Sequence, residues 1–481
     1  MKKLVVVGLW HQGVVASACM ADFGYDVIAI DKNIKYINSL SKGIAPIFEP
    51  GLNDLLKKGL KNKNLQFTSD LKGPFFRQKI IMIMFDTLVD ENDQSDLSDL
   101  FLVIDEIAPN LENDCILYVT SQVPVGTCEK IRKTIESKNP SLKFDIAYSP
   151  ENLRLGKAIE LFRKPSLPVI GAENINTFDR VKNLLSPLKA DWTYVNLKTA
   201  EMTKHALNSY LAVSVAFGNE LGNLCDEIGA NGHQIAKLLR LEPRVGKQAM
   251  LLPGLGFSGA TLARDIQTLR SLSHNFKLNS KLLDGVWNSN KMQNDLVIRK
   301  IKKKYNSLSG IHVSVLGLTY KPETSTLRRS AALEIINNMI KEEAVVSCHD
   351  PKANRSEVNS YSGFSFYEDI YSSLNGSQVL VLLTPWQDYK NIDYNVSTLD
   401  GEVFDIRNIR PMSDFIPSET AMTVTAAGLG EEYRKVTTRY IPNGKGITKL
   451  NKPEKKYIDE RSWNVWQAAT KNALHEEEKG P

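Results

Sequence analysis

The sequence predicts an α/β protein in which two doubly wound domains are joined by a central helical region with one long helix. Three observations support this fold class. Residues 4–31 read as strand, tight turn, helix, strand and acidic residue, and alternating strand and helix patterns follow. Residues 199–230 form one long amphipathic pattern. Residues 313–318 (VSVLGL) then begin a second alternating series.

The elements of the first domain follow one another closely. Residues 4–9 (LVVVGL) are a continuous apolar run, as expected for a strand buried on both faces. Residues 13–23 indicate a helix that stops at Gly24, a residue that suits a helix C-cap. Residues 27–30 form a second buried strand that ends at Asp31. Further strand-like runs occur at residues 80–85, 116–119 and 167–170. This alternation predicts a mostly parallel, Rossmann-like sheet with helices on both faces.

The remaining chain divides into three parts. We expect the first domain to cover residues 1–198 and the central helical region residues 199–305, since a helix this long usually bridges domains or forms a dimer seam. A second Rossmann-like domain is predicted over residues 306–430. Its strands are expected at residues 313–318, 345–348, 379–383, 403–406 and 422–425. Residues 431–481 turn basic, lose the strand pattern and are predicted to be a flexible tail.

Composition restricts the class of protein. The chain has 481 residues, 42% hydrophobic and 24% charged, which suits two or three globular domains. A net charge of +5 fits an anionic ligand but is too small and diffuse to indicate nucleic acid. No apolar run approaches the ~20 residues that span a bilayer, and the N-terminus shows no signal-peptide pattern. The five scattered cysteines argue against disulfides or a metal site and favour a reducing cytoplasm.

The turn after the first strand is the candidate cofactor site. Residues 8–13 (GLWHQG) match the dinucleotide fingerprint G-x-G-x-x-G at Gly8 and Gly13, but Trp10 occupies the position of the second glycine. That glycine normally lets the backbone approach the pyrophosphate. Asp31, at the end of the second strand, can hydrogen-bond the ribose hydroxyls and repel a 2′-phosphate, which predicts NAD rather than NADP. The alternative is a Rossmann-like domain that binds no dinucleotide.

Five motifs occur in the order typical of one enzyme family. They are residues 46–52 (PIFEPGL), 121–127 (SQVPVGT), 149–154 (SPENLR), 253–265 (PGLGFSGATLARD) and 315–322 (VLGLTYKP). They resemble PIxEPGL, STVPVGT, NPEFLR, PGxGFGGSCFPKD and VLGLAFKP of the UDP-glucose/GDP-mannose dehydrogenase family. Each match is weak alone, but all five in order are specific, and the resemblance spans about residues 3–428. It implies an N-terminal NAD domain, a central dimerisation region and a C-terminal domain that binds the nucleotide of a sugar donor.

The resemblance assigns roles to the matching positions. Lys204 and Asn208 lie four residues apart and so share a helix face, where lysine can stabilise a developing alkoxide and asparagine can donate a hydrogen bond. Asp265 matches an aspartate that positions a catalytic water, and Glu151 matches a glutamate linked to a later hydrolysis. The matched cofactor positions are Gly8, Gly13, Asp31, Lys35, Thr87, Gln122, Arg264 and Arg328. The matched substrate positions are Leu153, Arg154, Arg244, Gly256, Phe257, Gly259 and Lys321. The alternative for Lys204 and Asn208 is a solvated surface pair.

Departures from the family are equally informative. The family forms an acid in two oxidations, through a thioester on a cysteine, and that cysteine is Thr261 here. A threonine hydroxyl stays protonated near neutral pH and is a poor nucleophile without a dedicated base. Other changed positions are Gln122 for threonine, Leu155 for glutamate, Arg264 for lysine, and Tyr36 for a lysine, with Lys35 adjacent. Cys128 could stand in at a helix N-terminus, although a small buried residue is the simpler interpretation.

Three functions stay open on this evidence. The first is an NAD-dependent, UDP-glucose 6-dehydrogenase-like oxidoreductase, active as a homodimer through the central helix and supplying polysaccharide precursors. It would perform one oxidation, or two if water adds directly to a bound aldehyde with help from Glu151. The second is a non-catalytic protein that binds NAD and a sugar nucleotide, and the third is a scaffold recruited through the tail. We favour the first. A protein without catalytic activity would be expected to lose Lys204, Asn208 and Asp265 as readily as the cysteine, yet all three are present.

Overall fold

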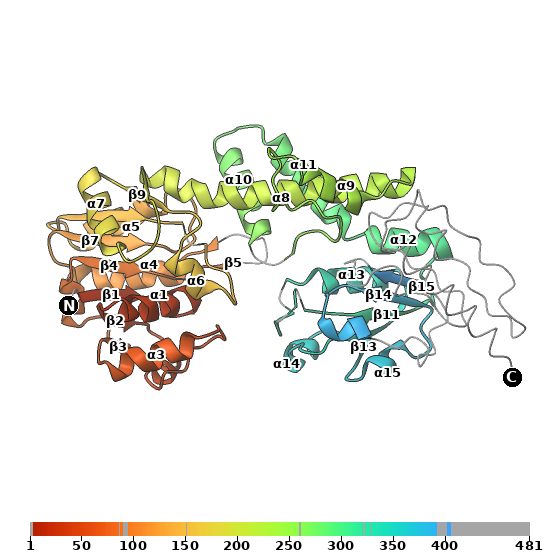
Figure 1. Ribbon diagram of the computed structural model, residues 1–481, viewed down its shortest axis with the longest axis horizontal. Coiled ribbons are helices and arrows are strands. Elements are labelled where there is room, and N and C mark those ends of the chain that lie inside the picture. Colours follow the sequence, from red (N-terminus) through yellow and green to blue (C-terminus); the bar gives the residue numbers. More distant parts are fainter. Residues whose placement is uncertain are drawn as a thin grey trace, which may run out of the picture. The chain divides into compact units, whose positions relative to one another are not determined.

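The computed structural model forms two units, residues 1–208 with 267–271, and residues 209–266 with 272–481 (Figure 1). It describes residues 3–85, 87–89, 95–150, 152–258, 261–319, 321–322, 324–327, 329–391 and 402–405. The strand predicted at residues 422–425 and the tail predicted from residue 431 lie outside these ranges. No helix within them is long and apolar enough to cross a membrane.

The first unit is built on an eight-stranded sheet. In spatial order its strands are β10 (Thr193–Val195), β9 (Val169–Ala172), β8 (Phe144–Tyr148), β7 (Cys115–Val119), β4 (Ile80–Ile83), β1 (Lys3–Val7), β2 (Asp26–Ile30) and β3 (Leu65–Thr68). All neighbours pair in parallel except β8 with β9. The strand order reverses between β1 and β4, which is the point where doubly wound sheets bind dinucleotides.

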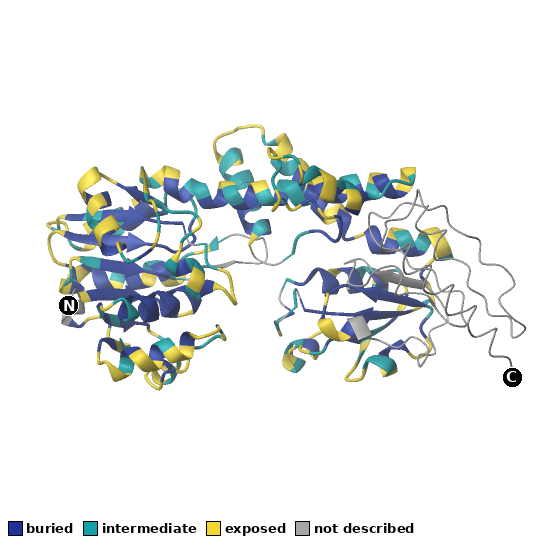
Figure 2. Ribbon diagram, in the orientation of Figure 1, coloured by how far each residue is buried: buried dark blue, intermediate teal, exposed yellow. Residues whose placement is uncertain are grey.

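Helices cover both faces of this sheet (Figure 1). They are α1 (His11–Asp22), α2 (Ile34–Leu40), α3 (Leu52–Lys61), α4 (Ser98–Ile107), α5 (Thr127–Lys138), α6 (Ala158–Arg163) and α7 (Ile175–Leu184), with a ribbon of β5 (Leu88–Val89) and β6 (Ser95–Asp96). Alternate residues of each strand enter two different cores, because side chains alternate across a sheet. Leu4 and Met82 pack with α1, α3, α6 and α7, whereas Val5 and Ile81 pack with α4 and α5. Figure 2 shows the central strands as almost wholly buried.

Two predicted bounds near the first turn were wrong by two residues, for one physical reason. The first strand ends at Val7 rather than residue 9, because Gly8 leaves the strand with φ +96°. The first helix begins at His11 rather than at Gly13, which lies inside its first turn. A Cβ at Gly13 would lie 1.7 Å from the carbonyl oxygen of Gly8, so the tight turn requires glycine there.

The predicted long helix is α8 (Leu197–Ile228), with 32 residues, and it runs from the first unit into the second. The second unit continues with α9 (Gly232–Leu239), α10 (Leu262–Asn275), α11 (Lys281–Gln293) and α12 (Leu296–Tyr305). Residues 267–271 of α10 belong to the first unit. The expectation that helices continue to about residue 305 is therefore confirmed.

The second unit also holds a five-stranded parallel sheet. Its order is β13 (Phe364–Tyr367), β12 (Val345–His349), β11 (His312–Leu316), β14 (Val379–Leu382) and β15 (Glu402–Asp405). Its helices are α13 (Ala331–Lys341), α14 (Arg355–Val358) and α15 (Ile370–Leu374). The order repeats that of β3-β2-β1-β4-β7, so the chain contains two doubly wound sheets, as predicted.

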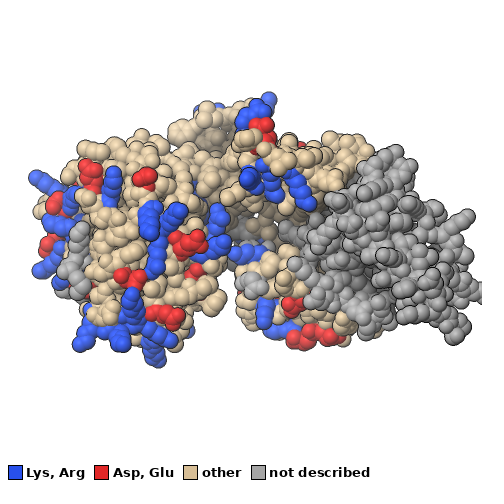
Figure 3. All heavy atoms as spheres, in the orientation of Figure 1, with Lys and Arg blue, Asp and Glu red and all other residues tan. Residues whose placement is uncertain are grey.

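Charges of both signs are interspersed on the face of the first unit seen in Figure 3. Among the charged side chains of this unit, Lys58 pairs with Asp22 at 2.6 Å and Lys79 pairs with Asp114 at 3.0 Å. Exposed pairs of this kind contribute little to stability.

Candidate active site

The cofactor turn is held closely against the second strand. Gly8 donates its backbone N–H to the carbonyl of Ile30 at 2.9 Å, and Leu9 donates its own to Oδ2 of Asp31 at 2.7 Å. The other oxygen of Asp31 accepts from the backbone of Asn33 at 2.8 Å. The predicted ribose-binding carboxylate therefore lies beside the turn, at the carboxyl end of β2, and its position is fixed by backbone donors.

Trp10 occupies the position of the second glycine with a negative φ. It is the residue before α1, with φ −91°, and its side chain is 38% exposed. The indole packs on Tyr36, with ring centroids 5.4 Å apart. Burial, followed by the charge of Asp31, raises the pKa of Tyr36. Two positions at which the sequence departs from the family thus form one aromatic pair beside the candidate ribose site.

Further cofactor positions follow the ends of β4 and β7. Thr87 donates its hydroxyl to the carbonyl of Gln122 at 2.6 Å, and Phe85 donates its N–H to Oγ of Ser121 at 2.7 Å. These bonds join the two loops at the edge where the strand order reverses. Lys35, in the first turn of α2, is exposed.

The turn after β11 in the second sheet has hydrogen bonds like those of the cofactor turn, but more protein donors contact its carboxylate. Gly317 donates to the carbonyl of His349 at 2.8 Å, as Gly8 does to Ile30. Oδ2 of Asp350 accepts from Leu318 N, from both Thr319 N and Oγ1, and from the Trp386 indole, at 2.8 to 3.1 Å. That carboxylate oxygen therefore accepts four hydrogen bonds from the protein itself.

Lys204 and Asn208 are not a solvated pair. Lys204 is 5% exposed and Asn208 is 4% exposed, although both lie on α8. Nζ of Lys204 donates to Oδ1 of Asn152 at 2.8 Å. A buried ammonium needs such a partner, because desolvation of an unpaired charge is costly. The alternative interpretation of a surface lysine and asparagine was therefore wrong.

Three residues that the sequence analysis did not single out hold this part of α8 in place. Glu201, 1% exposed, accepts from the backbone N–H groups of Gly126 and Cys128 at 2.6 and 2.8 Å. His205 Nε2 lies 2.9 Å from the carbonyl of Val123. Asn152 is the third, because it accepts the hydrogen bond from Lys204. The signal in the sequence was a cluster of polar residues at 201, 204, 205 and 208, which share one helix face.

The position of the missing cysteine lies at the start of α10. Thr261 is exposed and precedes the helix, with φ −95° and no capping hydrogen bond from its side chain. Arg264 and Asp265 follow in the first turn and are buried, and Arg264 Nε lies 3.5 Å from Asp265 Oδ1. The arginine that replaces the family's lysine thus forms an ion pair with the predicted water-positioning aspartate.

Amide side chains fix the glycine-containing loop before α10. Gly254 donates to Oδ1 of Asn219 at 2.9 Å, and Phe257 donates to Oδ1 of Asn290 at 2.6 Å. A Cβ at Gly256 would lie 2.8 Å from the backbone oxygen of Asn290. The glycine is needed for this close approach between the loop and α11.

The other predicted positions differ in their surroundings. Arg154 is exposed, Leu153 and Lys321 are half-buried, and Arg244 is exposed and paired with Glu242 at 2.8 Å. Glu151, Gly259 and Arg328 lie outside the described residues.

All five cysteines are buried. Burial raises the pKa of the Cys19 thiol to about 12 and that of Cys115 to about 11. Cys128 lies at the N-terminus of α5, as predicted, but burial and the carboxylate of Glu201 raise the pKa of its thiol well above the usual value. The structural interpretation of Cys128 is therefore favoured over a replacement nucleophile. No cluster of potential metal ligands occurs in the described part of the chain.

The doubly wound first sheet and its carboxylate-flanked turn define the class of a dinucleotide-binding protein, and a second doubly wound sheet follows. The NAD-binding, central and UDP-binding domain models of the UDP-glucose/GDP-mannose dehydrogenase family match residues 2–189, 198–292 and 314–411. The chain belongs to this family, and NAD is its cofactor.

Known relatives of the chain are dehydrogenases of the same family. UDP-glucose 6-dehydrogenases of Rickettsia bellii and Rhizobium meliloti are 31% and 30% identical to the chain, covering 84% and 85% of it and 95% of each relative. The UDP-glucose dehydrogenase structure from Pyrobaculum islandicum superposes with a TM-score of 0.77 at 26% identity, covering 85% of this chain and 95% of that one.

Proposed function

We propose that the protein oxidises a nucleotide sugar by a single hydride transfer. The primary alcohol of the sugar loses a hydride to NAD and a proton to water, giving an aldehyde, NADH and H⁺. The main supporting observation is the buried Lys204 ammonium, with Asn208 one turn away on α8, in the unit that contains the cofactor turn. A fixed cation and a hydrogen-bond donor stabilise the oxyanion that develops as the hydride leaves.

The remaining roles follow the family's pattern. Asp265, fully buried beside Arg264, would position the water that takes the proton. The proposed cofactor contacts are Gly8, Gly13, Asp31, Lys35, Thr87, Gln122, Arg264 and Arg328. The proposed substrate contacts are Leu153, Arg154, Arg244, Gly256, Phe257, Gly259 and Lys321.

The reaction is proposed to stop at the aldehyde because the chain offers no nucleophile for the thioester step. Thr261 has a hydroxyl in place of the thiol. No histidine lies within four residues of Thr261 in the sequence to act as its base. The five thiols are buried. Glu151 is left as the residue that could assist direct hydration of the aldehyde, which would allow a second oxidation.

We further propose that the protein is a homodimer through α8. Four large apolar residues of this helix are exposed in the single chain: Tyr210, Phe217, Leu224 and Ile228. The first three are spaced by seven residues, which places them on one side of the helix. An apolar stripe of this kind favours contact with a second copy of the helix.

The test is NADH formation with UDP-, GDP- and TDP-sugars. At least one sugar should give NADH, and Lys204→Met should lower kcat by about 10²–10³-fold, the usual effect of removing an oxyanion donor. Lys198→Met, an exposed lysine on the same helix, is the matched control and should leave kcat unchanged. NAD binding without turnover on any sugar would contradict the proposal and favour the non-catalytic alternative, which Trp10 and Thr261 also suggest.

A further inference from the structure

The adenosine ribose of NAD has a defined anchor in this chain. Asp31 directly follows β2, the position at which doubly wound domains hydrogen-bond the hydroxyls of that ribose. Its two oxygens accept from the backbones of Leu9 and Asn33 at 2.7 and 2.8 Å. A carboxylate oxygen can accept more than one hydrogen bond, so ribose hydroxyls can be added to these contacts. The residues present therefore fit the cofactor, and side chains beside Asp31 lie next to its adenosine half.

Two aromatic side chains lie beside this carboxylate. Trp10 directly follows Leu9, whose N–H donates to Asp31. Tyr36 lies in the first turn of α2, where burial and, less strongly, the charge of Asp31 raise its pKa. The ring centroids of Trp10 and Tyr36 are 5.4 Å apart and the ring planes are inclined by 34°, which is within the usual range of an aromatic pair. The two rings thus form one aromatic surface beside the anchor of the ribose.

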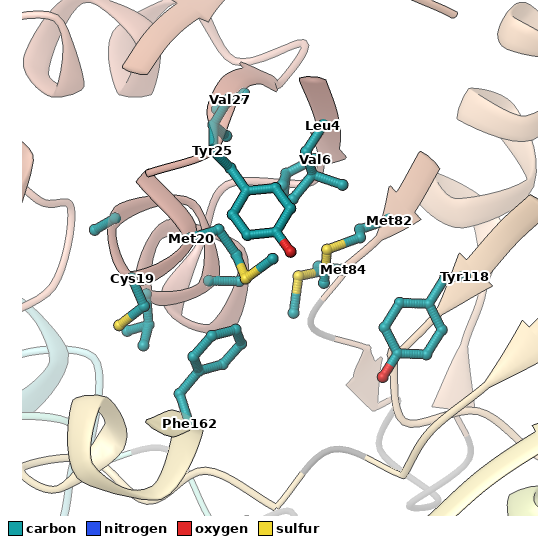
Figure 4. Packing of buried hydrophobic residues seen from close by; sticks show 14 of the residues in the cluster. Leu4, Val6, Cys19, Met20, Tyr25, Val27, Met82, Met84, Tyr118 and Phe162 are labelled. Carbon is teal, nitrogen blue, oxygen red and sulfur yellow. The ribbon is translucent and has the colours of Figure 1, made fainter. Parts of the chain in front are cut away.

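The protein holds this aromatic surface from its tyrosine side. Oδ1 of Asn33 accepts from the backbone N–H groups of Lys35 and Tyr36 at 3.0 and 3.4 Å, which fixes the first turn of α2. Tyr36 also packs against the core between α1 and the sheet. Figure 4 shows part of this core, with Met20 of α1 and Val27 of β2. The tyrosine ring is therefore in place before any cofactor binds.

The tryptophan side of the aromatic surface is open. Trp10 is 38% exposed, and among the tryptophans within the described residues it alone is in the exposed class. An indole face is apolar and flat, so it suits an adenine ring or the C–H face of a ribose. Stacking of a base on an aromatic side chain strengthens binding by about tenfold or more.

Both rings are departures from the family motifs. The family has glycine where this chain has Trp10, and a lysine where it has Tyr36. Each ring is the contact of the other, so the two departures together replace a small residue and a cation by one apolar surface.

We propose that Trp10 and Tyr36 form a binding surface for the adenosine half of NAD, with the Trp10 indole in contact with the nucleoside. The contact adds an apolar interaction to the hydrogen bonds at Asp31. It rests on NAD as the cofactor and not on the proposed single hydride transfer, because its tests use ADP, which cannot be reduced.

The first test is the tryptophan fluorescence of the full-length protein during titration with ADP, with excess UDP present to occupy the UDP-binding domain. Contact with the nucleoside changes the surroundings of the Trp10 indole, so the emission should change in step with binding. Trp10→Phe keeps an aromatic ring and should bind ADP within about threefold of the original affinity by calorimetry, but without the fluorescence change. No change in the original protein, or the same change in Trp10→Phe, would overturn the proposal.

The second test is the calorimetric affinity for ADP of variants that lack one ring. Trp10→Gly restores the family glycine and should weaken ADP binding by about tenfold, and Tyr36→Leu should weaken it by about threefold because the indole loses its support. Tyr194→Gly is the matched control. It removes the exposed ring of a second aromatic pair, Phe178 with Tyr194 at 5.3 Å, on the edge strand β10, and should leave the affinity unchanged. Circular dichroism checks that each variant is folded. An affinity in Trp10→Gly equal to or above the original would overturn the proposal.

Discussion

At the scale of single residues, the site is defined by polar groups that are buried and held. Lys204 is the clearest case, because a buried ammonium with a carboxamide partner has a fixed position before any ligand arrives. Asp31 is similar, since backbone donors orient both of its oxygens. Pre-positioned groups of this kind need no reorganisation when a ligand or a transition state forms.

Asp31 should set both the affinity for NAD and the preference over NADP. Asp31→Asn removes the charge but preserves the shape, so NAD should bind about ten- to a hundredfold more weakly through loss of charge-assisted hydrogen bonds. The preference over NADP should shrink, because the 2′-phosphate is no longer repelled. Calorimetry with both cofactors measures this. Asp26→Asn, at the other end of β2, is the control, and an unchanged NAD affinity in Asp31→Asn would contradict the assignment.

The cysteines should be unreactive in the folded protein. Their thiols are buried, and the pKa values of Cys19 and Cys115 are raised to about 12 and 11, so thiolate is scarce at pH 8 and increases only as the pH approaches those values. A thiol-specific reagent at pH 8 should label none quickly, and all five after denaturation. Rapid labelling of one thiol in the native protein would reveal a nucleophile that the account denies.

At the scale of elements, α8 and α5 depend on one carboxylate. Glu201 caps two N–H groups at the start of α5 and, by the same contact, fixes the turn of α8 that carries Lys204. The sequence could not predict this contact, because the partners are 73 and 75 residues apart. The unpaired N–H groups at a helix N-terminus are expected to have acceptors, but the sequence does not show that a residue of α8 supplies the acceptor for α5.

Replacing Glu201 should therefore destabilise the protein. Glu201→Ala leaves two buried donors unsatisfied and should lower the free energy of unfolding by about 1–3 kcal/mol. Urea unfolding should show a lower midpoint for this variant. Glu129→Ala, an exposed residue in the first turn of α5, should unfold at nearly the original midpoint. Equal midpoints for both variants would show that the cap is not structurally important.

Element positions were predictable where local pattern decides them. Buried strands such as β2 and β12 were predicted within one residue, because continuous β-branched runs are typical of parallel sheets. The start of α1 was misplaced, since the contact between Gly13 and the Gly8 carbonyl is a matter of packing rather than propensity. The Lys204–Asn152 bond joins residues 52 apart and also could not be predicted.

At the scale of the whole molecule, the proposed dimer contact through α8 can be tested by its oligomeric state. Phe217→Glu places a charge in the proposed α8 contact and should convert a dimer into a monomer, which light scattering of the eluting protein measures directly. Glu220→Gln, an exposed polar position on the same helix, should remain dimeric. A monomeric original protein, or a variant that stays dimeric, would argue against contact through α8.

The central claim is that hydride transfer occurs once per sugar, and the stoichiometry of NADH tests it most directly. The protein would be incubated with a limiting amount of each accepted nucleotide sugar and excess NAD until the absorbance of NADH stops rising, and the product identified by mass spectrometry. The account predicts one NADH per sugar and a carbonyl product. Two NADH per sugar with a sugar acid would contradict it, because the second oxidation would then proceed although Thr261 has replaced the cysteine.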